Sequence, residues 1–287
     1  MSTPKHTPET LAAWDHAHVW HPFTQHDEWE AEGAPLIIER AEGVHLIDVH
    51  GRRYLDGISS LWTNVHGHGH PAMVAALREQ LDRVAHSTLL GQAGTPSIVL
   101  AKRLVELVGR IPGSTPRLTR VFYSDSGSTA VEVALKLAFQ SCQQQGETRR
   151  TRFAALSDAY HGDTLGSVSV GGIDLFHAIY KPMLFDAVRI PSPDRPDPAA
   201  EADCLERAEA LIAAHGDTLA ALVVEPLVQG AAGMRMHSAG YLRRLIGMAR
   251  DAGARIIVDE VATGFGRTGT MFALEQVGVR PDLLCLA

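Results

Sequence analysis

The chain has 287 residues, which is enough for one large domain or two smaller ones. Hydrophobic residues make up 45% of it and charged residues 21%, the proportions of an ordinary globular protein with a packed core. The net charge of −7 argues against nucleic-acid binding, because such proteins usually carry a basic excess. No run of about 18 apolar residues occurs, so the sequence predicts no membrane span.

The N-terminus and the cysteines indicate the cellular compartment of the protein. The first residues lack the basic start and apolar run of a secretory signal. Cys142, Cys204 and Cys285 are far apart and form no CxxC pair. An odd number of isolated cysteines is typical of a reducing compartment rather than of a disulfide scaffold. We therefore expect a cytoplasmic protein.

The first part of the chain contains short extended runs at 36–39, 44–49 and 53–55. The alternation in VHLIDV and the turn residues between the runs predict a small antiparallel sheet. Two helical patterns follow, one opened by Pro71 and one that begins after Pro96, with apolar residues three or four positions apart.

Three histidines alternate with glycine in the run HGHGHP, residues 66–71. Such a cluster could bind a metal ion, but no cysteine and no helical pair of histidines accompanies it. We interpret the run as a glycine-rich loop before a helix, and the sequence predicts no metal site.

From Arg120 onward, strand patterns alternate with helical ones. Near-continuous apolar strands between helices are typical of a parallel sheet that is covered on both faces. The predicted fold class is therefore α/β, with a large and mostly parallel sheet. The expected strands lie at 120–124, 152–157, 186–191, 221–226, 254–260 and 282–287, and the expected helices at 127–142, 201–214 and 240–253.

A possible anion site lies in the run SDSGS, residues 124–128, which joins a predicted strand to a predicted helix. Backbone N–H groups and hydroxyls at a helix N-terminus can bind a phosphate, and the helix dipole favours its negative charge. The same residues would also form an ordinary capped helix start. The pattern alone leaves both interpretations open.

Two further candidates lie in loops that follow predicted strands. Asp259 and Glu260 end an apolar strand, where open α/β sheets bind their ligands, although a carboxylate there could also be structural. In enzymes that use pyridoxal 5′-phosphate (PLP), such an aspartate pairs with the protonated pyridine nitrogen of the cofactor. Tyr160 could lie against a flat ligand ring or simply cover its loop.

Residues 264–269 read GFGRTG and match the GxGxxG pattern of dinucleotide-binding loops. This match supports an alternative function, that of a dinucleotide-dependent oxidoreductase. The helical pattern behind it is short, however, and no acidic strand end follows about 20 residues later, as such a site requires.

Six segments together carry a family pattern: WHPFTQ (20–25), DGISSLWTNVHGHGHP (56–71), FYSDSGSTAVEVALKLAFQ (122–140), YHGDTLGSVSVGG (160–172), VEPLVQGAAGM (224–234) and DEVATGFGRTG (259–269). They resemble class III, fold-type I aminotransferases that depend on pyridoxal 5′-phosphate (PLP). Within that class they are most similar to the subgroup that aminates 8-amino-7-oxononanoate in biotin biosynthesis. Ala262 supports this subgroup, because related enzymes usually have glutamine there.

The resemblance implies an architecture and a set of roles. Residues 1–65 would contribute to a smaller α+β domain, and residues 66–287 would form the PLP-binding large domain, incomplete at its C-terminal end. The full-length protein would be a homodimer. By position in the motifs, Gly127 and Ser128 would hold the PLP phosphate, Tyr160 would face the ring and the substrate, Asp259 would bind the pyridine nitrogen, and Phe23 and Trp62 would line the substrate site.

Two departures from the family pattern matter. Phe23 and Leu61 stand where the enzymes that use S-adenosylmethionine typically have tyrosine and tryptophan, so the amino donor is either S-adenosylmethionine or lysine. The family's cofactor-binding lysine is expected just after Ala287, and the four lysines present lie elsewhere. We therefore expect the 287-residue chain itself to be inactive, and a remnant that only binds or assembles is a second alternative.

Overall fold

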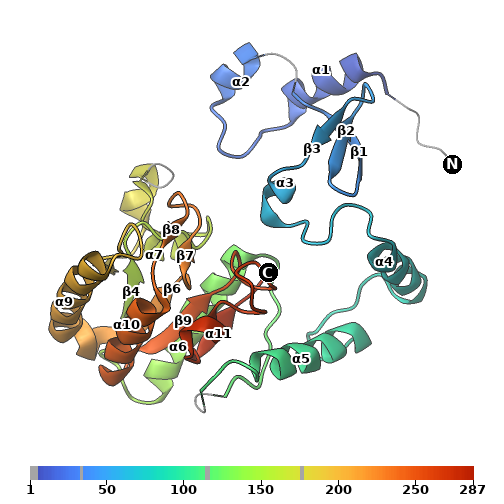
Figure 1. Cartoon of the computed structure of the whole chain (residues 1–287). Helices are drawn as coiled ribbons and strands as arrows, with labels where there is room; N and C mark the ends of the chain where they lie inside the picture. Colours follow the sequence, from blue (N-terminus) through green and yellow to red (C-terminus); the bar gives the residue numbers. More distant parts are fainter. Residues whose placement is uncertain (1–5, 33–34, 114–116, 175–177) are drawn as a thin grey trace. The chain divides into compact units, whose positions relative to one another are not determined.

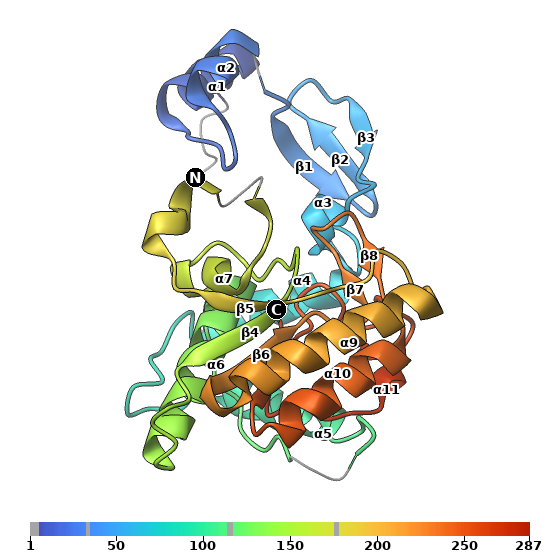
Figure 2. The same cartoon turned by 90° about the vertical axis from the view of Figure 1, so that its left-hand side faces the viewer.

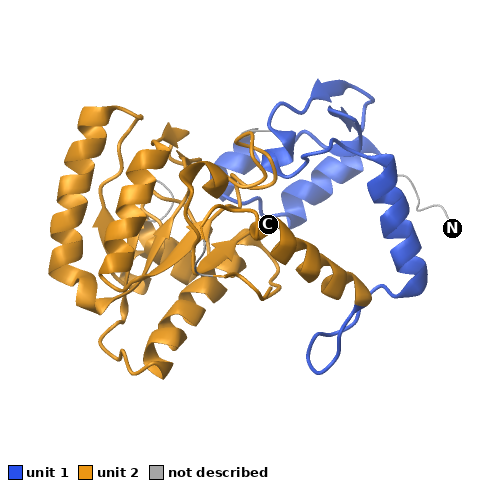
Figure 3. Ribbon diagram, turned by 60° about the horizontal axis from the view of Figure 1, so that its bottom comes forward, with its two compact units in different colours: residues 1–94 blue, residues 95–287 orange. Residues whose placement is uncertain are grey.

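The computed structural model describes residues 6–32, 35–113, 117–174 and 178–287. The chain forms two compact units, Met1–Gly94 and Thr95–Ala287 (Figure 3). The assignment of residues 1–65 to a smaller domain is a different division and stays a prediction.

The first unit is built around the predicted antiparallel sheet, which the structure confirms (Figure 1). Its strands pair in the order β1-β2-β3, with Leu46 opposite both Ala41 and Tyr54. Helices α1 and α2 were not anticipated; α1 begins with Pro8 after an N-cap by Thr7. The elements are α1 Pro8–His18, α2 His26–Glu32, β1 Ile38–Glu42, β2 His45–Asp48, β3 Arg53–Leu55, α3 Ser59–Trp62 and α4 Pro71–Arg83.

The second unit contains the predicted parallel sheet, whose strand order is β10-β9-β6-β4-β5. Each neighbouring pair is parallel, and the central strand β6 is buried along its whole length. The main elements are α5 Thr95–Val108, α6 Gly127–Gln144, β4 Arg152–Leu156, α7 Leu165–Val170, β5 Ala187–Ile190, α9 Pro198–His215, β6 Leu219–Val224, α10 Ala239–Asp251, β9 Arg255–Asp259 and β10 Leu283–Cys285. Shorter ones are the 3-10 helices η1 Ala178–Met183 and η2 Gly216–Thr218, the hairpin β7 Val228–Gln229 and β8 Arg235–Met236, and α11 Leu274–Val277.

Helices cover both faces of this sheet, as the near-continuous apolar strands predict. Successive strand residues point to opposite faces. Leu222 and Val224 pack in the cluster that includes α9 and α10, whereas Ala221 and Val223 pack in the cluster that includes α6. Figure 2 shows α9 and α10 side by side across the sheet. Among the described residues, none of the helices is both long and apolar enough to cross a bilayer.

One predicted strand is wrong: residues 120–124 have no strand structure. No strand neighbours this segment, and its backbone takes part in no backbone–backbone hydrogen bond within the described chain. A β-prone sequence forms a strand only where a partner satisfies its N–H and C=O groups, so the apolar pattern was not sufficient here.

Candidate functional site

The predicted carboxylate Asp259 lies at the carboxyl end of β9 and is buried. Its Oδ2 is 2.8 Å from Nδ1 of His161, and its Oδ1 accepts the backbone N–H of Val261 at 3.0 Å. Burial by itself lowers the pKa of His161, but the hydrogen bond and charge of Asp259 raise the pKa above its ordinary value.

Glu225 is a third buried ionisable group near this pair, and the motifs predicted no role for it. It follows β6, and its two oxygens accept the N–H groups of Tyr160 and Gly230, each at 3.1 Å. Burial raises the pKa of Glu225 to about 7, against the opposing charge of His161. The carboxylate therefore ties the loop after β4 to the loop after β6.

The predicted phosphate residues Gly127 and Ser128 are the first residues of α6, an 18-residue helix that Ser126 caps. Among the described residues, nothing accepts a hydrogen bond from either backbone N–H. A Cβ at Gly127 would lie 2.7 Å from Val261, so only glycine lets the helix start approach the end of β9 so closely. Unpaired N–H groups at a helix N-terminus are able to bind an anion, and the role of Gly127 and Ser128 toward a phosphate stays a prediction.

The loop after β4 packs against the same helix start. The hydroxyl of Ser128 accepts the backbone N–H of Thr164 at 3.0 Å. A Cβ at Gly162, whose φ is +108°, would collide with Ser128. Since His161 of this loop bonds Asp259, three elements distant in sequence meet at one end of the sheet.

Tyr160, the predicted ring-facing residue, is half-buried in this loop. Its hydroxyl donates to Oδ2 of Asp163 at 2.8 Å. Burial and then the bond to Asp163 raise the pKa of Tyr160, so the phenol is neutral near pH 7. Its role toward a ligand stays a prediction.

The two consecutive carboxylates of the DE pair have different surroundings. Glu260 is fully buried, and its oxygens accept the N–H groups of Ala273 and Leu274, each at 2.8 Å. Glu260 therefore holds the segment before α11. Asp259 bonds only the N–H of Val261 and the ring of His161, and it is the carboxylate that the structure brings to the helix start.

The structure does not support the dinucleotide alternative at residues 264–269. This run forms turns, and α11, the helix behind it, has only four residues. A pyrophosphate site needs a longer helix whose N-terminus directly follows the glycines. The HGHGHP run is a loop in which Nε2 of His68 lies 2.8 Å from Oδ2 of Asp56. The described part of the chain contains no group of three His, Cys, Asp or Glu residues suited to a metal.

The expected substrate residues Phe23 and Trp62 belong to the first unit. Phe23 has a positive φ of 53° and is exposed, and Trp62 ends α3 and is half-buried. The structure thus brings Gly127, Ser128, Tyr160 and Asp259 together, while the roles of Phe23 and Trp62 remain predictions.

The second unit defines a class of protein by its fold and site together: an α/β protein with a ligand site at the carboxyl ends of parallel strands. The site joins the start of α6, with two unpaired backbone N–H groups, to a buried carboxylate at a strand end. One buried imidazole nitrogen, Nε2 of His161, has no hydrogen-bond partner in the described structure. These features fit a flat ring that carries a phosphate on one side and a basic nitrogen on the other.

The chain belongs to the class-III aminotransferase family, whose family model matches residues 28–287. It is 58% identical over 287 aligned positions to the adenosylmethionine-8-amino-7-oxononanoate aminotransferase of Nitratidesulfovibrio vulgaris, covering 96% of this chain and 52% of that protein. The crystal structure of the enzyme of that name from Methanocaldococcus jannaschii is 42% identical and matches with a TM-score of 0.87, over 97% of this chain and 61% of that one.

A PLP-bound amine transaminase from an uncultivated Pseudomonas species is 37% identical, with a TM-score of 0.85, over 94% of this chain and 62% of that one. These likenesses confirm the fold-type I architecture and the α/β class. The chain spans 52% to 63% of the length of the curated relatives it matches.

Sequence reasoning missed His161 and Glu225 as members of the site. His161 appeared in the segment YHGDT, next to a residue that was assigned a role, and Glu225 followed an apolar strand just as Asp259 does. A carboxylate directly after a buried parallel strand was the available signal for Glu225, whereas His161 is an imidazole five residues beyond β4 and had no such signal.

Proposed function

We propose that this chain is the PLP-binding part of an aminotransferase that converts 8-amino-7-oxononanoate to 7,8-diaminononanoate in biotin biosynthesis. The observation that carries the proposal is the buried Asp259–His161 pair beside the unpaired N–H groups of α6. The names of the relatives from N. vulgaris and M. jannaschii support the substrate. The PLP-bound Pseudomonas transaminase supports the cofactor.

PLP, when bound, supplies an electron sink that stabilises negative charge developing at the substrate carbon. In this proposal, Gly127 and Ser128 would donate their N–H groups to its phosphate. Asp259 would face the ring nitrogen, and the hydrogen bond from His161 would fix the orientation of the carboxylate. Tyr160 bounds the ring and the substrate.

The rest of the assignment comes from the family. The chain would act in the cytoplasm as part of a homodimer, and Phe23 and Trp62 would line the substrate site. The amino donor would be S-adenosylmethionine or lysine. The lysine that completes the cofactor site would follow Ala287.

Cofactor binding can be tested on the 287-residue chain, because it contains the residues proposed to hold the phosphate and the ring nitrogen, namely Gly127, Ser128 and Asp259. We expect weak binding of PLP in equilibrium dialysis, and at least a tenfold loss of affinity in Asp259→Asn, since about 1.4 kcal/mol corresponds to a factor of ten. Asp282→Asn is the matched control. Asp282 also accepts a backbone N–H, that of Ile256 at 2.7 Å, but it lies at the N-terminal end of β10, whereas Asp259 lies at the carboxyl end of β9. Equal affinities for the two variants would contradict the proposed role of Asp259.

The donor can be tested in a chain extended to the length of its relatives. Phe23 lacks a phenol and Leu61 lacks an indole, so we expect turnover with lysine at least equal to turnover with S-adenosylmethionine. The measurement is diaminononanoate formed from the keto acceptor with each donor. Activity with S-adenosylmethionine alone would show that these two positions do not report the donor.

A further inference from the structure

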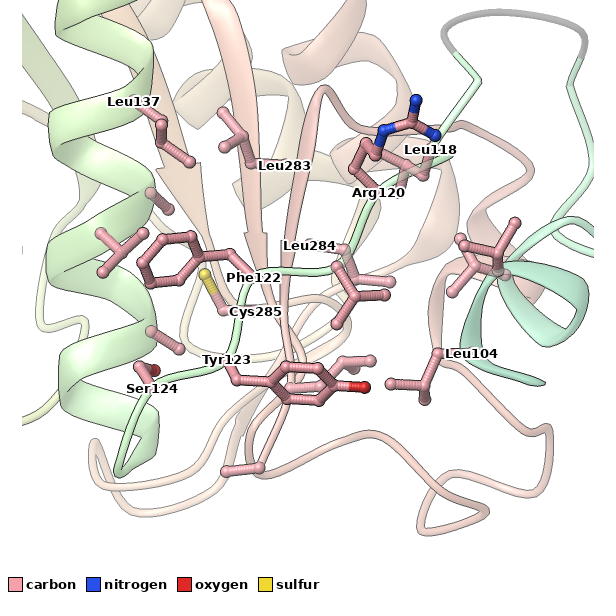
Figure 4. A pocket seen from close by; sticks show the side chains of 18 of the residues that line it. Leu104, Leu118, Arg120, Phe122, Tyr123, Ser124, Leu137, Leu283, Leu284 and Cys285 are labelled. Carbon is pink, nitrogen blue, oxygen red and sulfur yellow. The ribbon is translucent and has the colours of Figure 1, made fainter. Parts of the chain in front are cut away.

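Helix α6 has two different faces. One of them lines an apolar pocket of about 470 Å³ beside β10 (Figure 4), through Ala130, Val133, Ala134 and Leu137. Ser128 and Glu132 are four residues apart and therefore share the other face, roughly half a turn away. This second face meets the loop after β4.

Glu132 bonds that loop through a single oxygen. Its Oε2 accepts the hydroxyl of Thr164 at 2.8 Å and the backbone N–H of Ser167 at 3.1 Å. A Cβ at Gly166 would collide with the carboxylate oxygens, so only glycine lets α7 approach them so closely. The contact therefore joins α6 directly to the start of α7.

The carboxylate of Glu132 also caps α7. Thr164 is the N-cap residue of this helix, and an N-cap hydroxyl ordinarily accepts the N–H of the second or third helical residue. The Thr164 hydroxyl makes no such bond, and Ser167, the third residue of α7, donates its N–H to Glu132 instead. A side chain of one helix thus satisfies the first turn of another.

Through Thr164, Glu132 reaches Ser128. Thr164 donates its one hydroxyl hydrogen to Glu132, so its oxygen is left to accept. The hydroxyl of Ser128 lies 3.0 Å from that oxygen, and it accepts the backbone N–H of Thr164 at 3.0 Å. Ser167 adds a bond from its hydroxyl to the carbonyl of Ser128 at 2.9 Å. Ser128 is therefore held by two residues that Glu132 orients.

We propose that Glu132 is a positioning residue of the cofactor site, which fixes Ser128 and the loop that carries Tyr160. This inference rests on the proposed function, in which Ser128 holds the phosphate and the loop faces the ring. The loop is held at both ends, by Glu225 at the N–H of Tyr160 and by Glu132 at the start of α7.

Hydrogen exchange on the 287-residue chain tests this positioning without any cofactor. In Glu132→Ala, the amide of Thr164, which donates to Ser128, should exchange about tenfold faster, the scale expected when hydrogen bonds to a carboxylate are lost. The amide of Ser167 loses its acceptor directly, so the Thr164 amide is the one that reports an effect on Ser128. Glu132→Gln should restore the parent rates, because both bonds end on one oxygen and the glutamine amide keeps an acceptor oxygen.

Glu201→Ala is the matched control. Glu201 likewise accepts a backbone N–H and a hydroxyl, both from Ser238 and both at 2.6 Å, but it lies on α9. This variant should lose a comparable unfolding free energy and leave the Thr164 amide unchanged. In equilibrium dialysis with PLP, affinity should fall about tenfold, or about 1.4 kcal/mol, in Glu132→Ala and stay unchanged in Glu132→Gln and Glu201→Ala.

An unchanged Thr164 amide in Glu132→Ala would overturn the proposal, and so would unchanged PLP affinity where that amide exchanges faster. Equal effects in Glu201→Ala would show a general loss of stability and would also overturn it. Should Glu132→Ala not fold, Thr164→Val removes the hydroxyl with little change of shape and takes its place with the same expected result. If the unsubstituted chain bound no PLP, the proposed function would fail, and the exchange rates would still decide whether Glu132 positions the loop.

Discussion

At the scale of single residues, the site contains three buried ionisable side chains, Glu225, His161 and Asp259, and each is stabilised by different neighbours. All three side chains are buried, so each charge is stable only because of a neighbour. Asp259 and His161 form an ion pair at 2.8 Å. Glu225 instead satisfies its oxygens with two backbone N–H groups, and burial raises its pKa to about 7.

This raised pKa predicts the pH dependence of folding. The ordinary pKa of a glutamate is 4.5, so the folded state binds a proton at Glu225 more tightly than the unfolded state does. The resulting stability is complete below pH 4.5 and is lost as pH rises through about 7. In chemical denaturation of the 287-residue chain, the free energy of unfolding should fall between these pH values, by at most about 1.4 kcal/mol per unit.

Glu225→Gln removes the titrating group and keeps one acceptor oxygen. The decline in unfolding free energy over this pH range should become shallower in the variant. The control is Glu275→Gln, because Glu275 also accepts a backbone N–H, that of Phe272 at 2.9 Å, but lies outside the site. If Glu225→Gln shows the same decline of unfolding free energy with pH as the parent chain, Glu225 does not have the raised pKa.

At the scale of elements, α3 is the most unusual piece of backbone. All four of its residues, Ser59–Trp62, have a positive φ between 42° and 70°, which costs a non-glycine residue about 1–2 kcal/mol. Asp56 holds this turn: it accepts the N–H and the hydroxyl of Ser60 at 2.7 and 2.8 Å, and it pairs with His68. The strained turn carries Leu61 and Trp62, the expected substrate segment.

Removing this support should loosen the turn. In Asp56→Ala, we expect the amides of Thr63 and Asn64, which both donate to Ser59, to exchange with solvent at least tenfold faster. Hydrogen bonds to a charged group contribute about 1.5–3 kcal/mol, and about 1.4 kcal/mol corresponds to a factor of ten. Asp15→Ala, which breaks the 3.0 Å pair with His21 in the same unit, is the control and should leave these amides unchanged.

The elements also show what the sequence could and could not predict. Strands β4, β5, β6, β9 and β10 were predicted because their apolar runs are buried on both faces, a property of the local sequence. Residues 120–124 have a similar pattern, but no strand pairs with them within the described residues, and the local sequence does not reveal this. The positive φ values of α3 were not predictable, because they depend on Asp56 and His68 rather than on any residue with a left-handed preference.

At the scale of the molecule, the motif residues fall into two groups. Gly127, Ser128, Tyr160 and Asp259 come together because one sheet and one helix position them, and a parallel fold brings strand ends to a single edge. Phe23 and Trp62 belong to the other unit, Met1–Gly94. The sequence could therefore predict through the fold that Gly127, Ser128, Tyr160 and Asp259 lie together, whereas their roles toward a cofactor, like those of Phe23 and Trp62, rest on motif resemblance.

The last prediction concerns the activity of the 287-residue chain, and it follows from its lysines. Lys102 and Lys181 pair with Glu106 and Asp174 on the surface. Lys136 is exposed on α6, nine residues beyond Gly127, or about 14 Å along the helix at 1.5 Å per residue. Transamination needs an amine at the cofactor's carbonyl carbon that also moves a proton, so losing the family's lysine removes two functions.

We therefore expect this chain to show no transaminase activity and no borohydride-fixed pyridoxyl adduct at a single lysine. Peptide mapping after reduction in the presence of PLP measures the adduct directly. A chain extended to the length of its relatives is the positive control and should show both. A stoichiometric adduct on Lys102, Lys136 or Lys181 together with turnover would mean that one of these lysines serves the site. Such a result would contradict the expectation that the lysine follows Ala287, while leaving the binding roles of Asp259 and α6 intact.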